Sequence, residues 1–152
     1  MHPEKCTVWC GLYAGGIIGP YFFKDAVGRN VTVNGDRYRS MLTYFLLPKM
    51  EELNLVDMEN FGEQFISRNG PVSWPPRSCD LTPLDYFLWG YVKSKVYRNK
   101  PATIPALEYN ISEEIRAIPA EMLEKVAQNW AFRMDHLRRS RGQHINEIIF
   151  KK

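Results

Sequence analysis

The sequence of 152 residues predicts one α/β domain, in which a β-hairpin comes first and helices follow. Two observations predict this fold class. The first is a pair of segments rich in β-branched and aromatic residues, Cys6–Leu12 and Ile17–Phe23, with Gly15 and Gly16 between them. Such segments favour strands, and paired glycines favour a tight turn. The second is a series of later segments whose apolar residues recur at helical spacing. We therefore expect an antiparallel hairpin with helices packed on it.

The first helix is expected to begin at Asn34, after a short extended segment at Val31–Val33. The Asn34 side chain can cap the free backbone N–H groups of that helix. The apolar residues that follow fall on one helical face. They are Tyr38, Met41, Leu42 and Phe45. Pro48 should kink or end the helix, because proline has no backbone N–H to donate. Met50 and Leu53 could extend the apolar face beyond a kink.

The chain changes character between residues 51 and 79. Glu51–Gln64 is acidic and shows neither a helical nor a strand period, and a short strand is expected after it at Phe65–Ile66. Ser67–Cys79 contains three prolines, which favour an extended or turning path. We expect this part of the chain to connect the first helix to the next one.

Three further helices are expected in the second half of the chain. Thr82 fits the N-cap of the first of them, Pro83 its first position and Asp85 its third, which is a Thr-x-x-acid capping arrangement. Thr103 can cap the next helix, and Pro119 can open the last. Ile145–Phe150 is compatible with either a strand or a turn.

The composition is that of a globular protein, with 45% hydrophobic and 13% aromatic residues. No stretch approaches the ~20 apolar residues of a membrane span, and the first residues do not resemble a signal peptide. Three cysteines are too few for a disulfide framework, and no histidine stands at zinc-ligand spacing from them. We expect an intracellular protein with free thiols, without a membrane partner and without a cofactor.

The positive charge is unevenly distributed, although the net charge is only +3. Arg133–Lys152 holds six basic and two acidic residues, and a second basic group follows a helix as Lys93, Lys95, Arg98 and Lys100. Clustered cations attract phosphate backbones. Basic residues also stabilise helix C-termini by offsetting the macrodipole. Composition alone leaves both interpretations open.

One long motif adds a resemblance to a known family. Ser73–Lys93 reads SWPPRSCDLTPLDYFLWGYVK. It resembles the block around the third catalytic aspartate of mariner-type transposases, Pro-x-x-Ser-Pro-Asp-Leu-x-Pro-x-Asp-aromatic-aromatic-Leu, except that Cys79 replaces a common proline. The order of shorter segments is also similar to that in transposon reading frames of this type. These segments are Val8–Gly11, Gly19–Phe22, Val33–Gly35 and Arg138–Arg141.

The resemblance implies a truncated, C-terminal part of a DDE/DDD catalytic domain. It implies an incomplete ribonuclease-H-like fold with a mixed sheet over residues 1–100, followed by C-terminal helices over residues 101–152. In the intact family three aspartates hold two Mg²⁺ ions, which activate water or a DNA 3′-hydroxyl for attack on a phosphodiester. The third aspartate falls on Asp85, which is therefore the candidate catalytic and metal-binding residue.

The other two family aspartates have no counterpart in this sequence. The first lies on a strand that precedes the segment resembling Thr7–Cys10, and the second should end a strand with a motif like Gln-Asp-Gly-Ala. The acids of Glu51–Gln64 do not follow an apolar strand, and we interpret them as a solvated loop. Asp85 has a structural role as well, because an acid in the first helical turn offsets the macrodipole. We therefore predict no metal-dependent strand cleavage.

The function expected from these observations is that of a catalytically inactive, transposon-derived fragment that binds DNA or other nucleic acid weakly. The residues expected to contact phosphate are Arg138, Arg139, Arg141, Lys93 and Lys95. The family resemblance adds an expected nuclear location. One alternative is a helical protein-interaction module over residues 103–141, which would expose Trp130 and Met134 if their partners were lost and could self-associate. The other is an active metal-dependent transposase or endonuclease.

Overall fold

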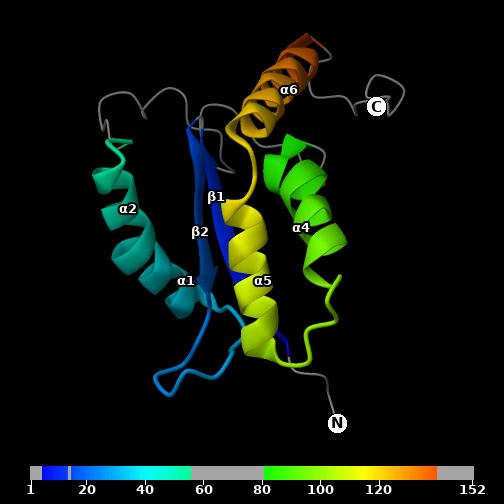
Figure 1. The fold of residues 1–152 in the computed structure, drawn as a ribbon. Coiled ribbons are helices and arrows are strands. Elements are labelled where there is room, and N and C mark those ends of the chain that lie inside the picture. The colour runs from blue at the N-terminus through cyan, green and yellow to red at the C-terminus, as the bar shows by residue number, and fades with distance from the viewer. Residues whose placement is uncertain (1–4, 14, 56–80, 140–152) are drawn as a thin grey trace.

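The structure is a computed structural model that describes residues 5–13, 15–55 and 81–139 (Figure 1). The described elements follow one another as β1 (Val8–Tyr13), β2 (Gly16–Phe22), α1 (Gly35–Met41), η1 (Leu42–Leu46), α2 (Leu47–Glu52), η3 (Leu84–Leu88), α4 (Trp89–Val96), α5 (Ile104–Arg116) and α6 (Ala120–Arg139). The two η elements are π-helical turns. The fold is a mixed α/β arrangement, as the sequence predicts. The expected strand at Phe65–Ile66 and the segment Ile145–Phe150 lie outside the described residues.

The two strands form the expected antiparallel hairpin, with Val8 opposite Phe22 and a register shift between Trp9 and Gly11. Gly19 faces this irregular point of β1 with a φ of +115°, and a Cβ atom on it would lie 3.0 Å from the Trp9 carbonyl oxygen. A glycine fits this position because it lacks the side chain that would clash. Within the described ranges the sheet has two strands, and they are antiparallel. The parallel strand that a mixed sheet would require is not among the described residues.

The segment after β2 continues the pairing only briefly. Lys24 and Asn30 form an isolated antiparallel bridge, and the Val31 N–H donates to the Phe23 carbonyl oxygen over 3.0 Å. Beyond this bond, residues 31–33 take no regular structure before α1 begins. The extended segment expected at Val31–Val33 is therefore anchored at its first residue and forms no strand.

Helices cover both faces of the hairpin (Figure 1). On one face lie α1, η1 and α2, from which the Phe45 ring contacts Tyr21 and Trp9, with centroids 4.9 Å and 6.4 Å apart. On the other face lie α4 and α5. Neighbouring residues of a strand point to opposite faces, and Cys10 accordingly belongs to the hydrophobic cluster under α4 and α5. The hairpin is thus the middle of three layers.

The main hydrophobic core lies on the α4 and α5 face. Its buried members are Cys10, Leu88, Val92, Val96, Ile111, Ile115 and Ile118. The three isoleucines are three or four residues apart and therefore lie on one side of α5 and of the residues directly after it. This confirms the amphipathic pattern predicted for this helix. Thr103 caps α5 as predicted, since its hydroxyl accepts a hydrogen bond from the Ala106 N–H over 3.3 Å.

The first helix runs through Pro48 instead of stopping there. Asn34 caps it as predicted, accepting a hydrogen bond from the Arg37 N–H over 2.9 Å. In η1 the Leu47 N–H donates to the Leu42 carbonyl oxygen, five residues back. This widened turn directly precedes the proline, which has no N–H for a regular ladder. The helix therefore does not end at Pro48: it continues to Glu52, and the hydrogen-bond pattern changes just before the proline.

The last helix, α6, matches the prediction of a helix from Pro119 to Arg139. It is held to the start of the η3–α4 helix by Tyr86, whose hydroxyl donates to the Val126 carbonyl oxygen over 3.1 Å. Met134 is buried, whereas 37% of Trp130 is exposed. Of the two residues expected to be exposed in a protein-interaction module, Trp130 is therefore the one that reaches the surface. No helix within the described ranges is long and apolar enough to cross a membrane.

Candidate nucleic-acid interface

Asp85 lies in the first turn of the helix formed by η3 and α4, and its side chain is exposed. The N–H groups of Asp85 and Tyr86 both donate to the Thr82 carbonyl oxygen, over 2.9 Å and 3.1 Å. Farther along, the Trp89 N–H donates to the Leu84 carbonyl oxygen, five residues back. The helix therefore begins at the predicted place, with Thr82 before it, and the Asp85 carboxylate lies where it offsets the macrodipole.

Among the described residues, no carboxylates join Asp85 to complete a two-metal centre. Such a centre needs several carboxylates that converge on the ions, and no group of three His, Cys, Asp or Glu side chains is close enough to hold an ion within the described part of the chain. Asp57, Glu59, Glu63 and Asp80 lie outside the described residues. Of the three aspartates that the resemblance implies, Asp85 is the one for which the described residues offer a position.

Three of the four cations around the end of α4 are exposed and form no ion pair with any described residue. They are Lys93, Arg98 and Lys100. By contrast, five exposed cations elsewhere each pair with a carboxylate three or four residues away. These pairs are Arg29–Asp25, Arg39–Asp36, Lys49–Glu52, Arg116–Glu113 and Arg139–Asp135. The charge at the end of α4 is therefore available to an external anion.

Lys95 differs from its neighbour Lys93. Its ammonium group donates to the Tyr91 hydroxyl, lies 4.1 Å from the centre of the Tyr91 ring and is 3.4 Å from Glu114 Oε2. The hydrogen bond to Tyr91, followed by the effect of Glu114, raises the pKa of Lys95. Lys95 thus already has partners inside the molecule, and it has less to offer a phosphate group than Lys93 has.

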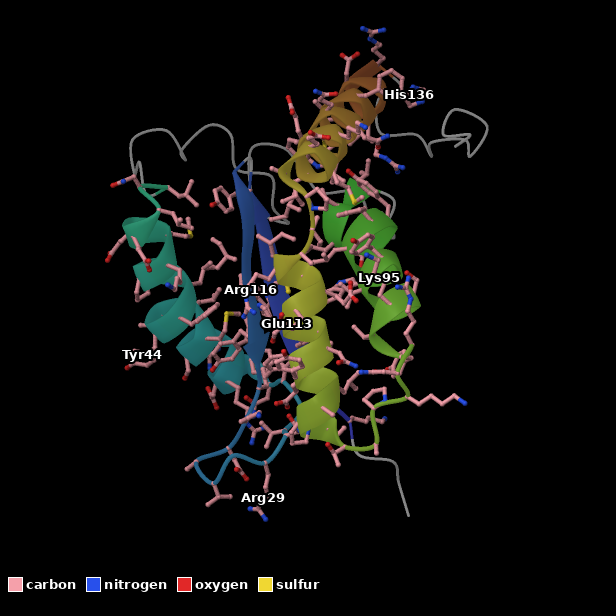
Figure 2. The ribbon with its side chains drawn as sticks, in the orientation of Figure 1. Arg29, Tyr44, Lys95, Glu113, Arg116 and His136 are labelled. Carbon is pink, nitrogen blue, oxygen red and sulfur yellow. The ribbon has the colours of Figure 1, made fainter. Side chains whose placement is uncertain are left out.

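The second predicted basic group lies at the far end of α6. Arg139 pairs there with Asp135 over 2.8 Å. Arg138 belongs to the last turn of α6, while its side chain and Arg141 lie outside the described residues. The C-terminal ends of α4 and α6 point to opposite ends of the molecule (Figure 1), and Figure 2 places His136 near the end of α6, well away from Lys95. The structure therefore separates the two basic groups.

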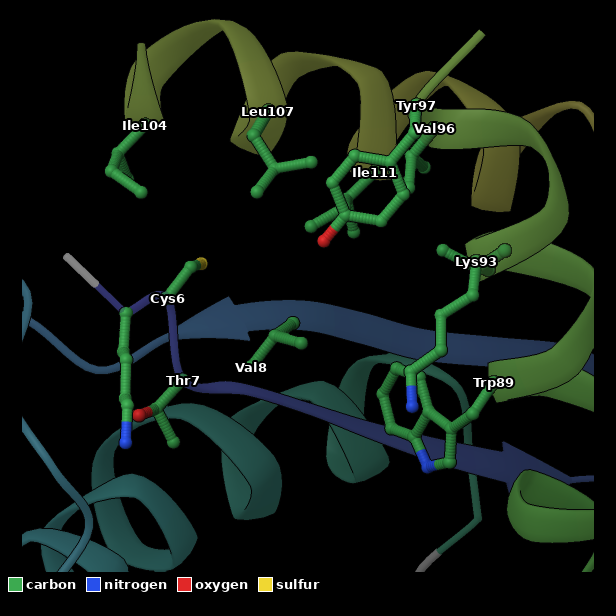
Figure 3. Close-up of a pocket in the computed structure, with 12 residues that line it drawn as sticks. Cys6, Thr7, Val8, Trp89, Lys93, Val96, Tyr97, Ile104, Leu107 and Ile111 are labelled. Atoms are coloured by element: carbon green, nitrogen blue, oxygen red, sulfur yellow. The ribbon is translucent and has the colours of Figure 1, made fainter. Parts of the chain in front are cut away.

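An open groove of about 600 Å³ lies beside the α4 cations. It is bounded by the start of β1 below and by α4 and α5 above, and Figure 3 shows Leu107 and Ile111 facing Val8 across it. Lys5 and Lys93 line it together with the aromatic side chains of Trp89 and Tyr97. Sequence reasoning missed this groove, because it is assembled from segments about 90 residues apart in the chain.

A partly buried ion pair near the groove was also missed. Lys24 Nζ, just after β2, lies 2.6 Å from Glu108 Oε2 on α5, and the Glu108 side chain is only 11% exposed. The other oxygen, Glu108 Oε1, is buried without a hydrogen-bond partner. Burial, and then the charge of Glu108, raise the pKa of the nearby Cys6 thiol. Lys24 thus neutralises a carboxylate that would otherwise repel anions from this side of the molecule.

No protein-family model matches this chain. Comparison with curated proteins gives no significant match either. The resemblance to mariner-type transposases therefore depends on the motif residues themselves. Of these, Leu81–Lys93 lie in the described structure, where they form the start of the η3–α4 helix and carry Asp85 on its first turn.

Proposed function

We propose that this chain is a transposon-derived fragment of a mariner-type transposase catalytic domain that binds nucleic acid weakly and does not cleave it. The observation that carries the binding proposal is the group of exposed cations at the end of α4, Lys93, Arg98 and Lys100, which form no ion pair within the described residues. The transposase origin is supported by the motif around Asp85. A hairpin covered by helices on both faces is compatible with part of a ribonuclease-H-like fold.

The expected binding is electrostatic. Cations that neutralise phosphates release condensed counterions, so affinity falls as salt rises, by a slope of ~0.9 per phosphate on duplex DNA. Contacts of this kind position a protein on the backbone and carry no sequence information. We therefore expect dissociation constants in the range of non-specific binding, ~10⁻⁴–10⁻⁶ M, with similar values for unrelated sequences.

The test compares two variants that lose the same charge. In the first, Lys93, Arg98 and Lys100 are replaced by glutamine. In the second, the locally paired Arg29, Arg39 and Lys49 are replaced by glutamine. We expect the first variant to lose ~2–3 from the slope of log affinity against log salt and the second to lose much less. Equal losses would show that net charge, and not this group of cations, determines binding.

A separate variant tests the contribution of the α6 end. Replacing Arg138, Arg139 and Arg141 with alanine should weaken binding to unrelated duplexes to a similar extent and flatten the salt slope. Because Arg139 already pairs with Asp135, we expect a smaller change than for the α4 variant. A triple variant that binds duplex DNA as well as the parent at low salt would remove the α6 end from the interface.

The absence of cleavage is tested with supercoiled DNA in the presence of Mg²⁺ or Mn²⁺. We expect no nicking above the background of a matched buffer control, because Asp85 lacks the convergent carboxylates of a two-metal site among the described residues. Nicking that is present in the parent chain and disappears in Asp85→Ala would overturn this part of the proposal.

A further inference from the structure

The groove beside α4 has the size and lining of a site for a flat apolar group. Its volume of about 600 Å³ falls within the ~300–1,000 Å³ typical of ligand pockets. Leu107 and Ile111 of α5 form one wall and Val8 of β1 forms the opposite wall (Figure 3). A planar ring that is not already stacked on other rings can bury its faces in such an apolar interior. A base inside a duplex does not meet this condition, whereas a base of a single strand does.

Tyr97 provides a stacking surface at this groove. It stands at the C-terminal end of α4, is 59% exposed, and its ring projects over the groove in Figure 3. Nucleobases stack on exposed aromatic rings in proteins that bind single strands, and each stacked base strengthens binding by about fivefold or more. The Trp89 indole lies farther along the groove, next to the Lys93 side chain (Figure 3).

The charge around the groove suits the phosphates that accompany a base. Lys5 and Lys93 both line it, and no acidic side chain of the described residues does. The three carboxylates of α5 are already paired, Glu108 with Lys24, Glu113 with Arg116 and Glu114 with Lys95. An anion that approaches the groove therefore meets two cations and no free carboxylate among its lining residues.

From this combination we infer that the groove binds single-stranded nucleic acid. One unpaired base enters it and stacks on Tyr97, while the adjacent phosphates contact Lys5 and Lys93. The inference depends on the proposed nucleic-acid binding and narrows it to an unpaired strand. Such a site discriminates between single strands and duplexes by shape and stacking, with little preference for sequence.

The experiment compares three fluorescently labelled ligands by anisotropy at low salt: a short oligothymidylate, an abasic strand of equal length and charge, and a duplex of that length. The parent chain should bind the oligothymidylate at least about fivefold more tightly than the abasic strand. Tyr97→Leu should abolish this difference. The matched control is Tyr109→Leu, which removes a 66%-exposed ring on α5 outside the groove and should preserve the difference.

Lys93→Gln should weaken binding of the oligothymidylate and the abasic strand alike, because it removes a phosphate contact and leaves the stacking surface in place. Equal affinity of the parent for these two ligands would overturn the inference, while salt-dependent binding of both would leave the proposed function intact. If the parent chain binds none of the three ligands, both the inference and the proposed nucleic-acid binding are wrong. A duplex that binds the parent chain as tightly as the oligothymidylate does would also overturn the inference.

Discussion

The helices on the two faces of the hairpin differ in how much of the core they bury and in how their exposed cations are paired. The helix α1–η1–α2 has one fully buried side chain, Met41, and its Phe45 ring contacts Trp9 and Tyr21 of the hairpin. Its exposed cations Arg39 and Lys49 pair with acids one turn away. The helices α4 and α5 enclose the main hydrophobic core on the other face, and the cations at the end of α4 have no such pairs among the described residues. The face that holds most of the core also presents the charge available to a ligand.

This difference indicates that stability and binding are unequally distributed over the molecule. On the α4 and α5 face, a substitution inside the core removes buried contacts, and a substitution at the helix end removes a ligand contact. On the α1–α2 face, most side chains are exposed, and Met41 is the buried exception. Substitutions of the exposed residues there should affect neither property strongly. The predictions below test this contrast.

The largest effect is expected from Leu88→Ala, because Leu88 is fully buried in the core. Removing such a side chain leaves a cavity and costs ~2–5 kcal/mol of unfolding free energy. The control on the other side of the molecule is Leu47→Ala on α2, where 47% of the side chain is exposed. We expect the control to lose less than ~1 kcal/mol. Urea denaturation measures both variants, and similar losses would show that the two faces contribute equally.

The next prediction compares an ion pair whose carboxylate is buried with a pair that is fully on the surface. Lys24→Met leaves the buried Glu108 carboxylate without its cation, and we expect a loss of ~1–3 kcal/mol of unfolding free energy. Lys49→Met breaks the solvent-exposed pair with Glu52 and should cost at most ~1 kcal/mol. Replacing Glu108 by leucine in the Lys24→Met variant should recover part of the loss, because no charge is then left buried. A loss for Lys24→Met no larger than that for Lys49→Met would contradict the prediction.

The elements that the sequence predicted well are those fixed by local chemistry. The Asn34 and Thr103 caps and the isoleucine face of α5 depend on residues within one or two helical turns. The Lys24–Glu108 pair could not be predicted in this way, because its partners are 84 residues apart in the chain. Lys93 and Lys95 looked alike in the sequence. They differ in the structure because Lys95 bonds Tyr91, one turn back on its own helix, and also pairs with Glu114 from α5. Only the second of these partners required the tertiary structure.

A pH effect is expected from Cys10, a member of the α4 and α5 core. Burial raises the pKa of this thiol to about 12, so the folded protein keeps the proton that the unfolded chain releases at lower pH. The stabilising contribution is complete below the unfolded pKa of ~8.5 and is lost as pH rises toward the folded value. Between pH 8 and pH 10 we expect a loss of ~1–2 kcal/mol that is absent from Cys10→Ala. Parallel pH curves for the two proteins would contradict the assigned cause.

The smallest effect is expected from Asp85→Asn. The side chain is exposed in the first turn of the η3–α4 helix, so its loss removes only an interaction with the macrodipole, worth at most ~1 kcal/mol. Chemical denaturation at low ionic strength measures the change, and high salt should reduce it because exposed charges are screened. A loss several times larger would show that Asp85 belongs to an interaction network with residues outside the described ranges.

The π-turns at Leu42–Leu46 and Leu84–Leu88 determine where the chain tolerates a change of length. A π-helical turn holds more residues than an α-helical turn, so each of these two helices contains a place that can lose a residue and revert to a regular ladder. The helix α5 has no π-turn. A deletion there would rotate all later residues of the helix by ~100° about its axis relative to the earlier ones. In an evolutionary lineage, single-codon insertions and deletions should therefore accumulate at residues 42–46 and 84–88 and be rare within Ile104–Arg116.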